Sequence, residues 1–238
     1  MPARFRFRLL PFAVAVVLVA AGVALAQWQW QRARETALLD ARMQARRLAP
    51  PLRGDVISAA DVDVVEFRRA HFDGSFVRTW PIYLDNRPYD GIAGYYLLMP
   101  FKIAGSDRYV LVARGWFPRD VEDRTRMPPL ATPDGVVQIE GIVRRDVGHV
   151  LQLGRTNPLR PGAILQNLDA ATFARASGLK MLPFVIEQTG DARDGLVRAW
   201  PGPPISAARH RAYAFQWYAL AAMAFVFFVV TGFRRGAG

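Results

Sequence analysis

The sequence predicts an α+β protein, a two-helix transmembrane hairpin enclosing an extracytoplasmic, mainly antiparallel β domain with one or two short helices. Three observations predict this fold. An uncharged apolar segment lies near each end of the 238-residue chain. The residues between these segments form short runs rich in β-branched and aromatic side chains, separated by glycine, proline, asparagine and aspartate. The mean hydropathy is slightly positive, at +0.08, although 21% of the residues are charged, so the apolar residues must be concentrated.

Both terminal segments are long enough to cross a membrane as helices. Leu9–Ala26 contains 18 residues and Ala212–Phe233 contains 22, and neither carries a charged side chain. At 1.5 Å per residue they span about 27 and 33 Å, against a hydrocarbon core of about 30 Å. The sequence therefore divides into a cytoplasmic tail at 1–8, a transmembrane helix at 9–30, an outer domain at 31–211, a second transmembrane helix at 212–233 and a tail at 234–238.

Arginines lie before the first span and after the second, and neither of these two tails has an acidic residue. They are Arg4, Arg6, Arg8, Arg234 and Arg235. Because short basic flanks stay in the cytoplasm, both termini are expected there and the main domain in the periplasm. The short segment before the first span leaves no room for an organelle transit peptide, so we expect a multi-pass protein of a bacterial inner (cell) membrane. A cleaved signal peptide ending at Ala24–Ala26 is the alternative. The length of the apolar run and the tryptophan-rich exit at Gln27–Arg32 favour an uncleaved anchor.

Within the outer domain, the helical pattern continues through Gln31–Leu48 to the prolines at 50 and 51, and Ser58–Asp61 reads as a capping box. One further helix is predicted at Ala170–Ser177, with Asp169 as its N-cap and Gly178 as its end. Gly105–Asp107 is predicted as a hairpin turn. Strands are predicted at Val62–Val77, Ile82–Asn86, Tyr95–Ile103, Tyr109–Trp116, Val136–Val147 and Phe184–Gln188. Short strands with few helices favour a small barrel or a sandwich.

Composition and motifs exclude several function classes. The chain has no cysteine, which removes disulfides and thiol ligands for metals. Its histidines, His71, His149 and His210, lack the spacing of a multi-histidine metal site. Neither span holds an ionisable residue of the kind that pumps and channels require. Part of the net charge of +11 comes from the arginines of the two terminal tails, which set the orientation in the membrane. The remaining basic residues form no cluster, so no nucleic acid is expected as a partner. No catalytic motif is present, and we expect no enzyme activity.

One cluster at the membrane interface is the candidate binding site. His210 lies two residues before the second span, with Tyr213 and Trp217 on the same helical face, while Trp28 and Arg32 stand one turn apart where the first span ends. If the two helices pack together, these side chains offer an imidazole, aromatic walls and guanidinium groups. Imidazole is a haem-iron ligand and arginines suit propionates, so His210 is the candidate metal ligand. The alternative is that they are ordinary interfacial anchors that meet membrane lipid.

Several motifs together resemble those of the Surfeit locus protein 1 family, the cytochrome c oxidase assembly factors. Their order along the chain and the two-span topology are also similar to that family. Ala26 and Ala113 depart from its pattern, since glycine and asparagine are common at these positions. The matching segments are Trp28–Arg32, Asp73–Phe76, Leu84–Arg87, Gly94–Tyr96 with Pro100, Val110–Pro118, which carries the most specific motif, and His210–Tyr218.

The resemblance implies a membrane assembly factor that binds haem a as transient cargo and assists its insertion into the catalytic subunit of cytochrome c oxidase. The family's proposed haem-binding histidine corresponds to His210. The catalytic subunit is the implied partner, with haem a synthase as a second candidate. A haem-independent scaffold for an oxidase assembly intermediate and a membrane-anchored enzyme with an unrecognised site stay open. For Arg114–Trp116 we favour a structural role, in which Gly115 permits a bulge or a close approach, Trp116 fills the core and Arg114 pairs with an acid.

Overall fold

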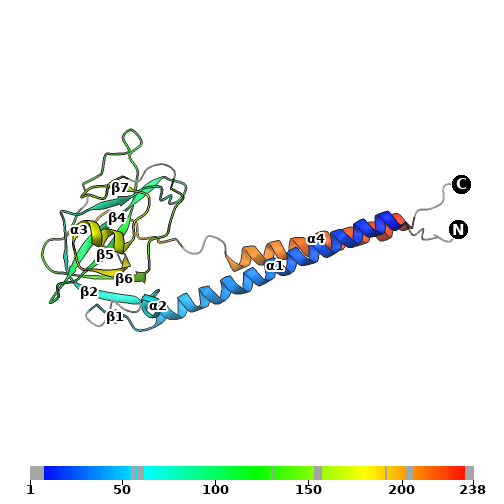
Figure 1. The fold of residues 1–238 in the computed structure, drawn as a ribbon, viewed down its shortest axis with the longest axis horizontal. Coiled ribbons are helices and arrows are strands. Elements are labelled where there is room, and N and C mark those ends of the chain that lie inside the picture. The colour runs from blue at the N-terminus through cyan, green and yellow to red at the C-terminus, as the bar shows by residue number, and fades with distance from the viewer. Residues whose placement is uncertain are drawn as a thin grey trace. The chain divides into compact units, whose positions relative to one another are not determined.

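The computed structural model describes residues 8–54, 57, 62–129, 131–152, 157–190, 192–201 and 206–233. The chain forms two compact units. One contains the two terminal segments, through Arg42 and from Gly202, and the other contains Met43–Pro201. The fold class is the predicted one, with two long terminal helices and a β-barrel domain (Figure 1).

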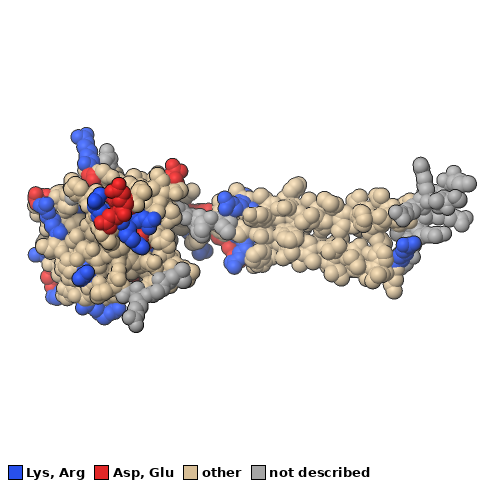
Figure 2. All heavy atoms as spheres, turned by 90° about the horizontal axis from the view of Figure 1, so that it is seen from above, with Lys and Arg blue, Asp and Glu red and all other residues tan. Residues whose placement is uncertain are grey.

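The helical unit contains α4 (Ala207–Gly232) and most of α1 (Leu9–Leu48), which continues beyond the predicted span as expected. Both helices are long and apolar enough to cross a membrane. On the face seen in Figure 2, the two helices carry no charged side chain along their middle, and basic side chains appear near the ends of the pair. Ser206 caps α4 by accepting a hydrogen bond from the backbone N–H of Arg209. These features fit a membrane-anchored protein.

The two helices run antiparallel and meet along a stripe of small residues. Gly22 lies so close to α4 that an added Cβ would come within 2.9 Å of the Ala221 Cβ. Nearer the chain ends, the rings of Phe12 and Phe228 are 5.7 Å apart. Small side chains let helices approach closely, which is how helices associate in lipid. We call this contact the helix interface; its buried residues are Ala15, Gly22, Ala26 and Ala33 of α1 and Ala207, Ala214 and Ala221 of α4.

The β domain is a barrel closed by five strands. Each strand pairs with the next, and the pairing of β2 with β4 closes the ring. The β5–β8 pair is parallel, whereas the other four pairs in the ring are antiparallel. In ring order the strands are β2 (Arg69–Phe76), β6 (Val137–Arg144), β8 (Met181–Gln188), β5 (Tyr109–Pro118) and β4 (Gly94–Ile103).

Three short strands and two short helices complete the domain. β3 (Ile82–Leu84) extends the sheet from β4, while the two-residue strands β1 (Leu52–Arg53) and β7 (Ile164–Leu165) pair in parallel with β2 and β3. The helix α3 (Ala170–Ser177) is capped by Asp169 and ends at Gly178, as predicted. The predicted capping box at Ser58–Asp61 lies outside the described residues.

One predicted strand is partly wrong. Val62–Val65 forms the one-turn helix α2 instead of the first part of a strand. The extended chain starts only at Arg69, because Phe67 takes a left-handed conformation with φ of 66° and its backbone N–H bonds to the carbonyl of Val143. The valines of Val62–Val65 therefore have no partner strand among the described residues, and local backbone geometry overrides their strand propensity.

Two apolar clusters form the core on the two faces of the barrel wall. Along β4, Leu97 and Phe101 belong to one cluster, whereas Leu98 belongs to the second, which also holds Phe173 of α3. All four side chains are buried almost completely. A strand buried on both faces reads as a continuous apolar run rather than an alternating one, which is the pattern seen in the sequence of this strand.

Candidate functional site at the helix interface

A hydrogen bond between His210 and Gln29 joins α4 to α1. The Nδ1 atom of His210 lies 2.8 Å from the side-chain oxygen of Gln29, and both side chains are half-buried. Gln29 lies three residues after the buried Ala26 and four before the buried Ala33, so it continues the small-residue stripe of α1. His210 lies three residues after the buried Ala207 in the same way. The polar pair is therefore part of the helix interface.

This contact fixes the chemistry of the imidazole ring. An amide oxygen only accepts hydrogen bonds, so Nδ1 of His210 carries the hydrogen and donates it to Gln29. The lone pair of the neutral ring is then on Nε2, which has no hydrogen-bond partner in the described part of the chain. Histidines that bind metals through one ring nitrogen usually donate the other N–H to an oxygen acceptor, which orients the ring and raises its basicity. In His210 the ring is held through Nδ1, and Nε2 is left as the open ring nitrogen.

Gln29 was not among the residues expected at the site. Its signal in the sequence is a polar side chain at a position where the spacing of Gly22, Ala26 and Ala33 predicts contact with another helix. The histidine at the same level of α4 supplies its partner. Sequence spacing alone did not give the register of one helix against the other, so the pairing was not predicted.

The other expected site residues lie at two positions along the two helices, one near Gln29 and one near Gly22. Trp28 and Arg32 lie on the turns of α1 around Gln29, with the Arg32 guanidinium carbon 5.9 Å from the centre of the Trp28 ring. Trp217 is half-buried, and its carbonyl oxygen would lie 3.3 Å from a Cβ added to Gly22, so it is two turns from His210 toward the other end of α4. Tyr213 and Trp28 are largely exposed, with 45% and 52% of their surface accessible.

Arg32 has a second partner in Glu35, one turn further along α1. Its guanidinium group lies 3.1 Å from a carboxylate oxygen of Glu35, and both side chains are about half exposed. An ion pair of this kind on a helix surface contributes only about 0.3–0.5 kcal/mol. The arginine therefore stays free to exchange its partner for another carboxylate.

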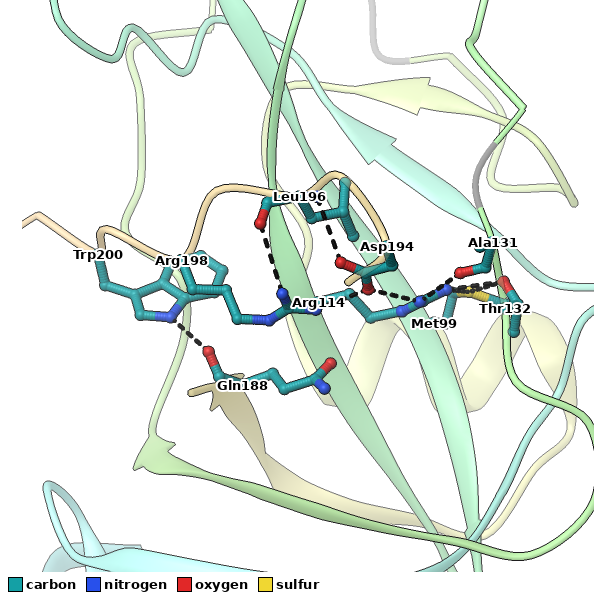
Figure 3. Close-up of polar contacts among 9 residues, drawn as sticks. All are labelled: Met99, Arg114, Ala131, Thr132, Gln188, Asp194, Leu196, Arg198 and Trp200. Carbon is teal, nitrogen blue, oxygen red and sulfur yellow. Dashed lines mark hydrogen bonds and ion pairs between the residues drawn. The ribbon is translucent and has the colours of Figure 1, made fainter. Parts of the chain in front are cut away.

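In the β domain, Arg114 is fully buried in a charged network (Figure 3). Its Nη2 atom lies 2.8 Å from Oδ2 of Asp194, and the same oxygen accepts a hydrogen bond of 2.6 Å from Arg198. Arg114 also donates to Thr132 and to the carbonyl of Ala131. Burial alone would raise the pKa of Asp194, but the hydrogen bond and charge of Arg198, with a smaller contribution from Arg114, outweigh it, so the pKa is lowered.

The next two residues complete a structural clasp. Gly115 has a φ of 152°, and a Cβ there would come within 2.8 Å of the Leu196 Cβ. The register of β4 against β5 shifts at this point, which marks a bulge. Trp116 is buried and exchanges backbone hydrogen bonds with Val197. The structural interpretation of Arg114–Trp116 is confirmed, because this motif ties the segment before α4 to the barrel.

Comparison with known proteins identifies the family. The model of the SURF1 family matches residues 16–222. The chain belongs to the SURF1 family.

A SURF1-like protein of Rickettsia felis is 37% identical over 89 residues, which is 36% of this chain and 37% of that protein. The chain thus spans about a third of the length of this curated relative. The SURF1 match includes Gln29, His210 and the clasp, so the barrel and most of the helix interface lie within the family's span. The resemblance drawn from the sequence motifs is therefore confirmed at the level of the family.

One further titratable group of this SURF1 protein lies in the barrel wall. Glu187 of β8 is buried and lies 3.3 Å from Arg144 of β6. Burial raises the pKa of Glu187 to about 7, although the charges of Arg144 and Arg47 act in the opposite direction. Among the described residues, no group of three histidine, aspartate or glutamate side chains could hold a metal ion.

Proposed function

We propose that this protein is a membrane-anchored assembly factor for cytochrome c oxidase. It binds haem a as transient cargo and assists its insertion into the catalytic subunit. The observation that carries the proposal is the hydrogen bond from Nδ1 of His210 to Gln29, which leaves Nε2 as the ligand for the haem iron. Membership of the SURF1 family supports the same assignment.

The neighbouring side chains suit a cargo that must later be released. Trp28 precedes Gln29 on α1, and Tyr213 follows His210 by three residues on α4. Both are exposed and offer aromatic surface to the macrocycle, while Trp217 is half-buried further along α4. Arg32 can exchange Glu35 for a haem propionate. A haem held through His210 as its one ligand from this chain would bind with the moderate affinity that transfer to another protein requires.

The apolar end of the site is suited to the isoprenoid tail of haem a. Phe225 is exposed on α4, with 59% of its surface accessible, and so can contact the tail. The Phe228 ring packs against Phe12 within the helix interface and so is less available to the tail. Lipid-facing aromatic surface beside the haem would keep the tail out of water during transfer.

We place both termini in the cytoplasm and the β domain in the periplasm of a bacterial inner membrane, because arginines flank both spans at the chain ends. In that orientation the His210–Gln29 pair lies at the periplasmic side of the membrane. The oxidase catalytic subunit would then receive haem at this level, and haem a synthase would supply it. No enzymatic step is part of the proposal.

Haem content of the purified protein tests this function. The full chain is expressed in cells that make haem a, and bound haem is measured by its absorption spectrum. We expect His210→Ala to lose most of the haem. His149→Ala is the matched control, because its exposed ring lies in the β domain and, among the described residues, pairs with Asp146 alone. Equal haem in the wild type and in His210→Ala would overturn the haem assignment.

A haem-independent scaffold is the second candidate, favoured by an arginine-lined cleft on the β domain that could receive a partner protein. It predicts normal oxidase assembly in a His210→Ala strain and failure when the cleft is altered. Spectroscopic assay of assembled oxidase in membranes of both strains separates the two functions.

A further inference from the structure

A surface cleft of about 220 Å³ lies on the β domain, where β3 ends. Three arginines, Arg87, Arg119 and Arg124, line this cleft together with Asp85 and Gln166. The carboxylate of Asp85 is already engaged, since Oδ1 accepts from the backbone N–H of Asn86 and Oδ2 pairs with Arg124. The four charged groups leave two positive charges without an acidic partner inside the cleft.

Arg87 is the buried cation of the arginine cleft. Only 6% of its surface is exposed, and its guanidinium group donates to the carbonyls of Val147, Gly148 and Gln166. Within the described part of the chain it has no carboxylate partner. Its burial lowers its pKa, because water no longer stabilises the charge. The guanidinium carbon also lies 5.5 Å from the centre of the Tyr96 ring, and the charge of Asp146 acts on it without an ion pair. A buried cation whose hydrogen bonds go to neutral oxygens is a site where an anion is favoured.

Arg119 is the accessible cation of the cleft. Its side chain is exposed and forms no ion pair with any described residue, while its backbone N–H bonds to the carbonyl of Ala93. That backbone bond holds the residue at the cleft wall. The guanidinium group can therefore bind an incoming carboxylate without first leaving another partner.

Exposed apolar side chains lie next to the lining residues of this cleft in the chain. Ile92 and Tyr89 belong to the tight hairpin that separates two lining residues, Pro88 and Ala93, and 55% and 38% of their surfaces are accessible. Val121, fully exposed, lies between Arg119 and Arg124. A free inorganic anion would need no such border. A peptide would place apolar side chains on it.

The hairpin is a rigid support for this surface. Its central residues, Asp90 and Gly91, both have positive φ, which is the geometry of a tight two-residue hairpin turn. The Tyr89 ring lies 5.2 Å from that of Trp116, and the indole N–H of Trp116 donates to the carbonyl of Arg87 at 2.7 Å. The border is therefore preorganised by contacts with the barrel.

We propose that the arginine cleft is a docking site for an acidic segment of a partner protein, with one carboxylate side chain in the cleft and apolar neighbours on Ile92 and Val121. Charge complementarity and the apolar border together favour this occupant. The site is separate from the proposed haem function, so it can be tested without haem.

The test uses the full-length chain in uncharged detergent and a fluorescent hexapeptide with one glutamate between two leucines. Binding is measured by fluorescence anisotropy, beside a peptide with glutamine in place of glutamate. We expect the glutamine peptide and the Arg119→Gln variant each to weaken binding about tenfold, as loss of a charge-assisted hydrogen bond predicts. Arg126→Gln is the matched control, since it removes the same charge from the same loop outside the cleft and should change affinity less than twofold.

Three outcomes would overturn the proposal. Equal binding of the two peptides would remove the role of the carboxylate. Equal loss in Arg119→Gln and Arg126→Gln would mean that general surface charge attracts the peptide. Binding of inorganic phosphate that depends on Arg119, without binding of the glutamate peptide, would make the cleft a small-anion site instead of a docking surface.

Discussion

The helical unit and the barrel bury polar side chains in different ways. In the barrel, Asp194 pairs with two buried arginines that lie on separate chain segments, and Glu187 joins neighbouring strands through Arg144. At the helix interface, contact is made by alanine and glycine, and one polar pair, Gln29 and His210, interrupts the small residues. The ion pairs of the barrel therefore join segments that are distant in the sequence. The small residues let the helices approach closely, and the Gln29–His210 pair adds a hydrogen bond between them.

The largest effect is expected where the barrel depends on a single acid. Asp194→Ala leaves Arg114 and Arg198 buried without a carboxylate, so we expect a loss of about 3–5 kcal/mol in unfolding free energy. Chemical unfolding of the full chain in detergent, followed by tryptophan fluorescence, measures it. Asp134→Ala is the control, because Asp134 is mostly exposed and its ion pair with Arg78 is on the surface. Similar losses in both variants would mean that the buried network does not stabilise the barrel.

Glu187 makes the stability of the barrel depend on pH. Its folded pKa of about 7 is above its ordinary value of 4.5, so its contribution is complete below pH 4.5 and is lost as pH rises through 7. The difference corresponds to about 3 kcal/mol. We expect the unfolding free energy of the wild type, relative to Glu187→Gln, to fall over this pH range. A constant difference between the two proteins would contradict the raised pKa.

The clasp should be less sensitive than the ion network. Gly115→Ala places a Cβ against Leu196 in a backbone conformation that favours glycine, and we expect a loss of about 2 kcal/mol in unfolding free energy. Gly141 is no suitable control, because its own Cβ would meet Ile186. Ala131→Gly, beside the same network, changes the backbone without adding a contact. If Gly115→Ala has the unfolding free energy of the wild type, the close approach to Leu196 does not require a glycine.

The helix interface gives the smallest expected change in stability. Gly22→Val forces a branched side chain against Ala221, and we expect a loss of about 1 kcal/mol, at the lower end for overpacked sites. Ala21→Val adds the same side chain on the neighbouring exposed position and should change little. Thermal unfolding of both variants in detergent compares them. If Ala21→Val were the more damaging, the faces of α1 would be assigned wrongly.

Local sequence patterns predicted the helices and strands. They could not predict which residues, distant in the sequence, pair with one another. Asp169 and Gly178 marked the ends of α3 because caps act within one turn. The apolar run of β4 predicted a strand, but not its closure against β2. Asp194 lies 80 residues from Arg114, so the sequence indicated that an acid was needed without saying which one.

The candidate site shows the same limit. His210 and Trp28 stood out by their place beside an apolar span. Gln29 did not, because a glutamine at a helix interface has meaning only once the opposite residue is known. The parallel pairing of β5 with β8 was also missed, since strand direction depends on how the intervening chain crosses the barrel.

The most direct test of the central claim observes the iron–histidine bond. Resonance Raman spectra would be recorded for the ferrous protein isolated with haem a, in the wild type, His210→Ala and Gln29→Leu. We expect an iron–histidine stretching band in the wild type, its loss in His210→Ala, and a shift in Gln29→Leu because Nδ1 no longer donates to the amide oxygen. A wild-type protein that carries haem a but has no such band, or whose band is unchanged in Gln29→Leu, would contradict the account.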